Sequence, residues 1–308
     1  MKDFLIDEDL LMKFNVVVGN PPYQDGTIND EAHKLWGKFA KLAFEMTKPN
    51  GFIAMITPST WLNPADDVPG TNIFTDLFKK NDLILANVAN AVLQREFFPN
   101  VGSRFTWWIV RKGDYSGSTH FITEDGEIDI DISDVDYLPK RISKESVSII
   151  KKFNLKKDTF DWLRQGDLSG ETVKEKDENH PYPCYHTPAK GGRYWWGKTK
   201  NPYADTPKIL VSLSGKYVPH FDNQSGFTKM CIIALFETEE EGLNAVTILN
   251  SKLYRWIVEQ SKHSGFNTLK PILALPKLDI HRPWTDMEIY AAFNLTQEEI
   301  DYIESKIK

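Results

Sequence analysis

The chain is predicted to be an α/β protein, with an open sheet of the doubly wound type followed by an α+β domain. A β-α-β unit in residues 14–56 and a strongly β-prone run at residues 105–110 indicate the first part. The second part is indicated by a change of character, because residues 180–207 are rich in proline, glycine and aromatic residues. We expect two domains, 1–137 and 138–308, each of ordinary size.

The first strand lies in residues 14–23, FNVVVGNPPY. Val16, Val17 and Val18 are consecutive β-branched residues, as in a strand that is covered on both faces. The paired prolines after Asn20 end this strand abruptly. Because ligands of open α/β sheets bind beyond the carboxyl ends of the strands, the residues after the strand are candidates for chemistry.

The Asn20-Pro21-Pro22-Tyr23 turn suits a flat molecule that carries an exocyclic amine. Asn20 Oδ1 and the Pro21 carbonyl oxygen can both accept hydrogen bonds from the amine, and the Tyr23 ring can stack on the plane. The alternative is a rigid turn without chemistry, because asparagine and proline are common turn formers. The valine strand and the glycine before the turn favour the functional interpretation.

The next elements complete the first domain. Apolar residues at helical spacing predict a helix over residues 30–46, which ends at Lys48–Gly51, and residues 52–56 form the next buried strand. The later elements expected here are a loop at 57–62, a helix at 71–80, a strand at 83–92, a turn at 96–102, the strand at 105–110 and a hairpin at 113–132.

The second domain begins with a lysine-rich hinge and helix over residues 138–157, a pattern that is typical of a solvated face. We expect strands at residues 208–213 and 230–236 and a single helix over residues 239–259. A last helix over residues 297–307 is predicted to open with a capping box. Its members are Thr296 and Glu299.

Aromatic and basic residues are interleaved in the loop-rich segment 180–207. Rings can stack on bases and cations can meet phosphates, so the pattern suits a nucleic-acid surface. The alternative is that the rings fill a core. The candidate DNA-binding residues are Arg193, Tyr194, Trp195, Trp196, Lys198 and Lys200. His180 and His186 flank a single cysteine, and we interpret this spacing as a coincidence and expect no metal site.

Composition excludes several classes of protein. A formal charge of −6 argues against nonspecific coating of nucleic acid, although a local basic groove is compatible with it. Two isolated cysteines, Cys184 and Cys231, do not make a disulfide framework. No apolar run is long enough to span a bilayer, and the N-terminus has no secretory signal, so the cytoplasm is the expected compartment.

Taken in order, these motifs resemble the gamma-type N6-adenine DNA methyltransferases, in particular the Taq-type enzyme and the methylase portions of fused type II restriction-modification enzymes. The matching segments are Asp3–Leu5, the NPPY motif, FIAMITPSTWL at residues 52–62, and FFPNVGSRFTWWIVRK at residues 97–112. Leu249–Leu253 and Leu275–Leu278 resemble the target-recognition domain of that family. The resemblance implies a partial Rossmann-like methyltransferase sheet.

The resemblance also implies roles for individual residues. Asp3 and Phe4 match motif III, which contacts the adenine of the cofactor S-adenosylmethionine. The resemblance also makes Asn20 a candidate cofactor-binding residue. The NPPY motif matches motif IV, the catalytic loop of Asn20, Pro21, Pro22 and Tyr23. Phe98 matches the motif VIII aromatic, which stacks on the flipped target base opposite Tyr23. The implied reaction is direct methyl transfer to the amine of a flipped adenine in double-stranded DNA.

The sequence departs from the family at motif I, the glycine-rich loop that should lie before motif III. We therefore expect a second chain, or a further N-terminal region, to supply motif I. Two other classes of function stay open. The NPPY loop also occurs in methyltransferases that act on protein glutamine or on RNA, and a non-catalytic DNA-binding or subunit-interaction protein could keep the same substrate half of the sheet.

Overall fold

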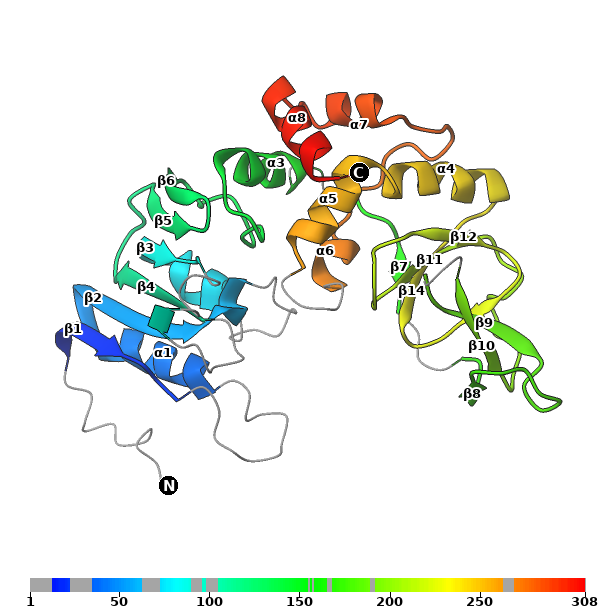
Figure 1. The fold of residues 1–308 in the computed structure, drawn as a ribbon, viewed down its shortest axis with the longest axis horizontal. Helices are drawn as coiled ribbons and strands as arrows, with labels where there is room; N and C mark the ends of the chain where they lie inside the picture. Colours follow the sequence, from blue (N-terminus) through cyan, green and yellow to red (C-terminus); the bar gives the residue numbers. More distant parts are fainter. Residues whose placement is uncertain are drawn as a thin grey trace. The chain divides into compact units, whose positions relative to one another are not determined.

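The chain folds into two compact units, Met1–Val147 and Ser148–Lys308 (Figure 1). The structure, a computed structural model, describes residues 13–22, 35–62, 73–89, 96–97, 105–154, 156, 158–164, 168–188, 192–262 and 269–307. The division between the two units falls inside helix α3 (Lys144–Asn154). The domain border at 137/138 that the sequence suggests lies earlier in the chain and stays a prediction.

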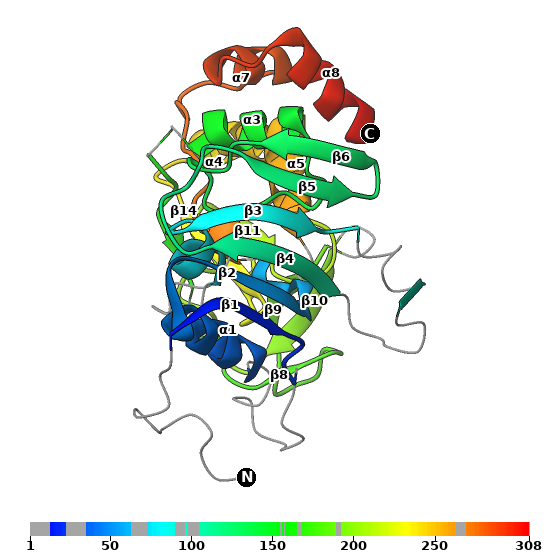
Figure 2. The same ribbon diagram turned by 90° about the vertical axis from the view of Figure 1, so that its left-hand side faces the viewer.

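The first unit contains a six-stranded mixed sheet in the order β1-β2-β4-β3-β5-β6, which Figure 2 shows side by side. The strands are β1 (Phe14–Gly19), β2 (Thr47–Pro58), β3 (Asp82–Asn87), β4 (Phe105–Arg111), β5 (Thr119–Thr123) and β6 (Gly126–Ile130). β1 runs parallel to β2 and β3 parallel to β5, while β4 is antiparallel to both of its neighbours. The predicted α/β class is therefore confirmed.

Helical segments cover one face of this sheet. They are α1 (Leu35–Met46), the 3₁₀ turn η3 (Ser59–Leu62) and the π-helical turn η4 (Phe74–Phe78), where the sequence had predicted a helix over residues 71–80. The buried residues of α1 recur at positions i, i+4, i+7 and i+8, so one stripe of the helix faces the core. The Phe78 ring meets the Trp108 ring edge to face at 4.8 Å and joins η4 to β4.

The opposite face of the sheet is apolar and open. Val16 and Val18 of β1 are 56% and 76% exposed, and the neighbouring Phe52 of β2 is 41% exposed. Ile53 and Trp108, whose side chains point to the other face, are fully buried. The sequence predicts that β1 is covered on both faces. Among the described residues, only one face of β1 is packed. The valine run is apolar on both sides, but α1 can cover only one of them.

The second unit combines two four-stranded sheets with a group of helices. One sheet has the order β13-β9-β10-β8 and the other β12-β11-β14-β7. The strands are β7 (Trp162–Leu163), β8 (Thr172–Val173), β9 (Tyr182–Thr187), β10 (Arg193–Gly197), β11 (Lys208–Ser212), β12 (His220–Asp222), β13 (Gly226–Phe227) and β14 (Cys231–Leu235). The helices are α4 (Glu239–Leu249), α5 (Lys252–Gln260), α6 (Leu269–Leu273), α7 (Asp286–Ala292) and α8 (Gln297–Lys306).

Two predictions for this unit need correction. The segment 180–207, expected to be rich in loops, contains the paired strands β9 and β10, because its aromatic residues favour extended backbone more strongly than its prolines and glycines oppose it. The helix expected over residues 239–259 is two helices. Ser251 Oγ accepts from the Tyr254 amide and opens α5, so the chain turns between them. The capping box at Thr296 and Glu299 is confirmed.

Candidate functional sites

Asn20 follows the carboxyl end of β1 directly. β1 and β2 run parallel, with Gly19 opposite Met55, so the ends of both strands lie at the same edge of the sheet. Asn20 and Pro22 are exposed and Pro21 is buried. Among the described residues the Asn20 side chain has no hydrogen-bond partner, so its amide is available to a ligand.

A cavity of about 680 Å³ opens beside Asn20 on the uncovered face of the sheet. Its walls come from β1, β2 and β4 and from Phe97. Its lining residues are Val18, Gly19, Asn20, Ala54, Met55, Ile56, Phe97, Phe105, Trp107, Trp108 and Ile109. The volume lies within the range of about 300–1,000 Å³ that is usual for small-molecule sites, and the Asn20 amide is the polar side chain of this apolar wall.

The two tryptophans of β4 serve different faces of the sheet. The Trp108 Nε1–H group donates to Thr57 Oγ1 at 3.0 Å, and this ring is fully buried. Trp61 of η3 donates from Nε1 to Thr106 Oγ1 at 2.7 Å and packs edge to face on Phe78 at 5.0 Å. These contacts hold β4 in one register, and strand alternation then places Trp107 in the wall of the cavity.

Several residues expected from the sequence lie outside the described residues. These are Asp3, Phe4, Tyr23 and Phe98. Phe97, which the sequence analysis did not select, is described, is 65% exposed and lines the cavity. Trp107 was also missed, although the alternation of the run at residues 105–110 could have indicated that its two tryptophans point to opposite faces.

The aromatic-basic candidates of the second unit lie on and just after β10. Tyr194 faces inward, where its ring meets the Tyr185 ring edge to face at 5.6 Å and packs on a core cluster of buried residues. Burial and the nearby Asp222 carboxylate raise the pKa of the Tyr194 hydroxyl. Trp196 lies on the same side of the strand as Tyr194, and Lys176 Nζ stands 5.0 Å from its ring centroid.

The cationic members of this segment differ in their surroundings. Arg193 and Lys198 are exposed. Lys200 is also exposed, but its ammonium donates to the Asp205 carboxylate. The partly exposed Trp195 stacks on His186, with ring centroids 4.3 Å apart. Sequence reasoning set His186 aside, and no sequence signal places it next to Trp195, because the contact depends on the register between β9 and β10.

Comparison with known proteins finds one family model that matches part of the chain. Residues 2–86 match the family model described as Eco57I restriction-modification methylase. This range includes β1, the NPPY sequence, α1 and β2. The N-terminal part of the chain is therefore similar to restriction-modification methylases. No curated protein sequence matches the chain.

Solved structures show partial likeness. The M protein of the type I restriction enzyme EcoKI is 18% identical, with a TM-score of 0.30, over 36% of this chain and 25% of that protein. A type I methyltransferase subunit from Streptococcus thermophilus is 18% identical, with a TM-score of 0.29, over 41% and 31% of the two chains. A DrdV–DNA complex is 11% identical, with a TM-score of 0.48, over 90% and 43%. The chain thus spans about a quarter of the EcoKI protein and less than half of the DrdV chain.

Two further observations concern the described part of the chain. None of its helices has the length and apolar character that crossing a membrane requires. Within the same ranges, no group of three or more histidine, cysteine, aspartate or glutamate side chains is arranged to hold a metal ion.

Proposed function

We propose that this protein is the substrate-binding part of a site-specific DNA adenine-N6 methyltransferase of the restriction-modification type. The observation that carries the proposal is the match of residues 2–86 to a restriction-modification methylase family, combined with the position of Asn20. Its amide stands at the carboxyl end of a parallel strand, beside a cavity of suitable size. The family match, which includes Asn20, and the cavity beside this residue both support the proposal.

In this proposal the NPPY loop holds the amine of a flipped adenine. Asn20 Oδ1 and the Pro21 carbonyl oxygen accept hydrogen bonds from the two amine N–H groups, which raises the electron density on nitrogen. Tyr23 and Phe98 stack on the two faces of the base and keep it out of the duplex. Positioning of this kind supplies a large share of the rate, because it replaces an encounter in solution.

The methyl donor proposed is S-adenosylmethionine, which supplies an electrophilic methyl group when bound. Asp3, Phe4 and Asn20 are the residues of this chain proposed to hold it. The apolar cavity next to the Asn20 amide fits a ligand with a flat ring and a few polar groups. The proposed DNA-binding residues of the second unit are Arg193, Tyr194, Trp195, Trp196, Lys198 and Lys200.

A second candidate is a non-catalytic DNA-binding or subunit-interaction protein. The open apolar face at Val16, Val18 and Phe52 favours an interaction with another polypeptide segment, because a face of this kind is stabilised when a partner covers it. In the enzymatic proposal, the same partner segment supplies motif I. Both candidates therefore include association through this face, and they differ only in catalysis.

One experiment separates the two candidates. The full chain is titrated calorimetrically with S-adenosylmethionine, and separately incubated with duplex DNA and the labelled cofactor, with product nucleosides analysed by mass spectrometry. N6-methyladenine in the product supports the enzyme. Both measurements are repeated with a second chain that carries motif I, because the enzymatic proposal needs that segment. Duplex binding without cofactor binding or methylated product in its presence selects the non-catalytic candidate, and methylation of cytosine rejects the adenine assignment.

A further inference from the structure

His186 is placed on β9 so that its ring faces away from the hydrophobic core. The neighbouring Tyr185 is buried in the core cluster with Leu210, Phe227, Cys231 and Ile233. Because successive side chains of a strand alternate, His186 points to the other side. Trp195, which pairs across the strands with Cys184, also points to that side and lies next to His186.

Two contacts hold the imidazole in one orientation. The ring stacks on Trp195 with an interplanar angle of 26°, and the Nδ1 atom is hydrogen-bonded to Thr228 Oγ1 at 2.8 Å. The Thr228 residue is itself fixed, because its amide donates to the Tyr185 carbonyl oxygen at 3.0 Å and its side chain is buried. The imidazole can therefore neither rotate about its ring axis nor swing away without losing a contact.

The remaining ring nitrogen, Nε2, is left for a ligand. It has no hydrogen-bond partner among the described residues. It is also not fully buried, so a ligand can reach it. Burial and the neighbouring Arg193 guanidinium lower the pKa of the imidazole, so the ring is neutral at neutral pH. A neutral imidazole in a fixed orientation presents one directional hydrogen-bonding atom. It carries no positive charge that would attract a phosphate.

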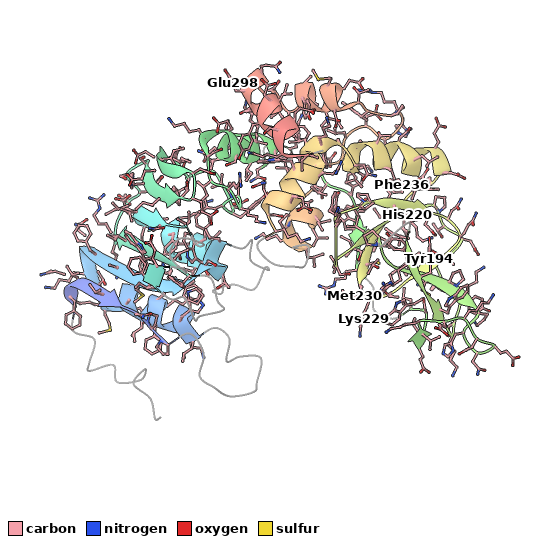
Figure 3. All side chains as sticks on the ribbon, viewed as in Figure 1. Tyr194, His220, Lys229, Met230, Phe236 and Glu298 are labelled. Carbon is pink, nitrogen blue, oxygen red and sulfur yellow. The ribbon has the colours of Figure 1, made fainter. Side chains whose placement is uncertain are left out.

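Two cationic residues lie on the segments that hold this ring, and Arg193 is close enough to lower the imidazole pKa. Arg193 begins β10, and Lys229 follows Thr228 in the turn before β14. Both side chains are exposed. Figure 3 shows Lys229 and Met230 together at the start of β14, with Phe236 at the other end of that strand. The arrangement combines a stacked pair of rings, a ring nitrogen without a partner among the described residues, and the exposed cationic side chains of Arg193 and Lys229 on the adjoining segments.

We propose that His186 reads DNA sequence, with its Nε2 atom forming a hydrogen bond to a base edge while Arg193 and Lys229 contact the flanking phosphates. This inference rests on the proposed DNA-binding function of the second unit. Base edges in the major groove carry a distinct pattern of donors and acceptors, so one oriented ring nitrogen can distinguish base pairs at one position. Phosphate contacts fix the register in which that reading occurs. Thr228 is then a positioning residue, because it acts through His186.

Two substitutions separate the two ring nitrogens. Asparagine places an amide group where Nδ1 lies and has nothing at the place of Nε2, whereas glutamine reaches the place of Nε2. We expect His186→Asn to lose the preference for one base pair and His186→Gln to keep part of it. Loss of one hydrogen bond corresponds to a drop in preference of about 3-fold to 10-fold at that position.

The experiment selects bound duplexes from a pool with a randomised central segment, using the full chain and its variants, and sequences the bound fraction. Melting temperatures verify folding. His220→Asn is the matched control, because His220 also stacks on an aromatic ring, that of Tyr185 at 5.1 Å, but lies on β12. Thr228→Val is expected to weaken the preference at the same base position as His186→Asn, without change in the salt dependence of binding.

The outcomes are distinguishable. Relaxed preference at one position in His186→Asn, with the rest of the selected sequence retained, supports the proposal. Identical selected sequences in wild type and both His186 variants overturn it, and so does an equal loss of affinity for all duplexes in both variants, which indicates packing alone. Wild-type binding without any sequence preference overturns the reading role and leaves the DNA-binding proposal standing. Absence of duplex binding overturns the proposed DNA-binding function as well.

Discussion

Removal of single charges from β10 and from the segment that follows it tests whether this surface contacts DNA. Each phosphate contact contributes about 0.9 to the slope of log affinity against log salt concentration. Arg193→Gln and Lys198→Gln are each expected to reduce this slope by about 0.9, because both side chains are exposed. Lys200→Gln is expected to reduce it much less, since the Asp205 carboxylate already neutralises the Lys200 ammonium.

The expected change is large enough to measure. Between 50 and 200 mM salt, loss of one phosphate contact changes the relative affinity by about 3.5-fold, and loss of two by about 12-fold. Fluorescence anisotropy of a labelled duplex, measured at four or more salt concentrations, gives the slope directly. Asp205→Asn is the control in the opposite direction, because it releases Lys200 and should steepen the slope.

Unchanged slopes in both Arg193→Gln and Lys198→Gln refute the reasoning. These two residues then belong to an ordinary solvated surface. A decrease in Lys200→Gln equal to that in Lys198→Gln contradicts the argument from the Asp205 ion pair specifically. Reduced affinity with an unaltered slope in any variant points to a change in packing around β10.

Three other predictions follow from the two units. Tested with the complete enzyme, in which motif I is supplied, Asn20→Ala and Tyr23→Ala are expected to abolish methylation and leave duplex binding nearly unchanged, because both side chains are proposed to act on the flipped base; anisotropy and product analysis measure the two effects. Val18→Asp is expected to reduce association of the chain in analytical ultracentrifugation, because Val18 is 76% exposed on the open apolar face. Lys152→Met is expected to lower the free energy of unfolding at pH 7 by about 1–3 kcal/mol, because Glu299 is 4% exposed and loses a 2.7 Å hydrogen bond.

The Glu299 prediction also has a pH dependence. Burial by itself raises the pKa of this carboxyl, but the hydrogen bonds from Lys152, Ser148 and the Thr296 amide outweigh it and hold the pKa below its ordinary value of 4.5. A lowered pKa in the folded state stabilises the protein above pH 4.5 and loses that contribution as the pH falls through the folded value. The difference between wild type and Lys152→Met should therefore shrink in chemical unfolding below pH 4.

Each of these predictions has a contradicting result. Loss of duplex binding in Asn20→Ala and Tyr23→Ala, in parallel with methylation, means that the NPPY loop is structural. Leu243→Asp serves as the control for Val18→Asp, because Leu243 is 48% exposed on α4, and equal effects of both substitutions argue against a specific face. A constant difference between wild type and Lys152→Met from pH 7 to pH 3 contradicts the assignment to the Glu299 carboxyl.

Local sequence alone determined helix α1 and most strands of the first unit. The valine run, the helical spacing of α1 and the β-prone run of β4 depend on neighbours in the chain, so periodicity and proline placement were sufficient. The capping box at Thr296 is local for the same reason. Such signals act over a few residues and need no tertiary contact.

Only the tertiary structure decided which faces and rings come together. The run from Val16 to Val18 is apolar on both sides, and packing of α1 against one side leaves the other exposed. The stack of His186 on Trp195 depends on strand register, and a slip of one residue would turn these side chains to the opposite face of the sheet. Register is set by pairing between segments that are distant in the chain. The sequence therefore determined the strand-forming tendency of β9 and β10, whereas the fold determined what their side chains can contact.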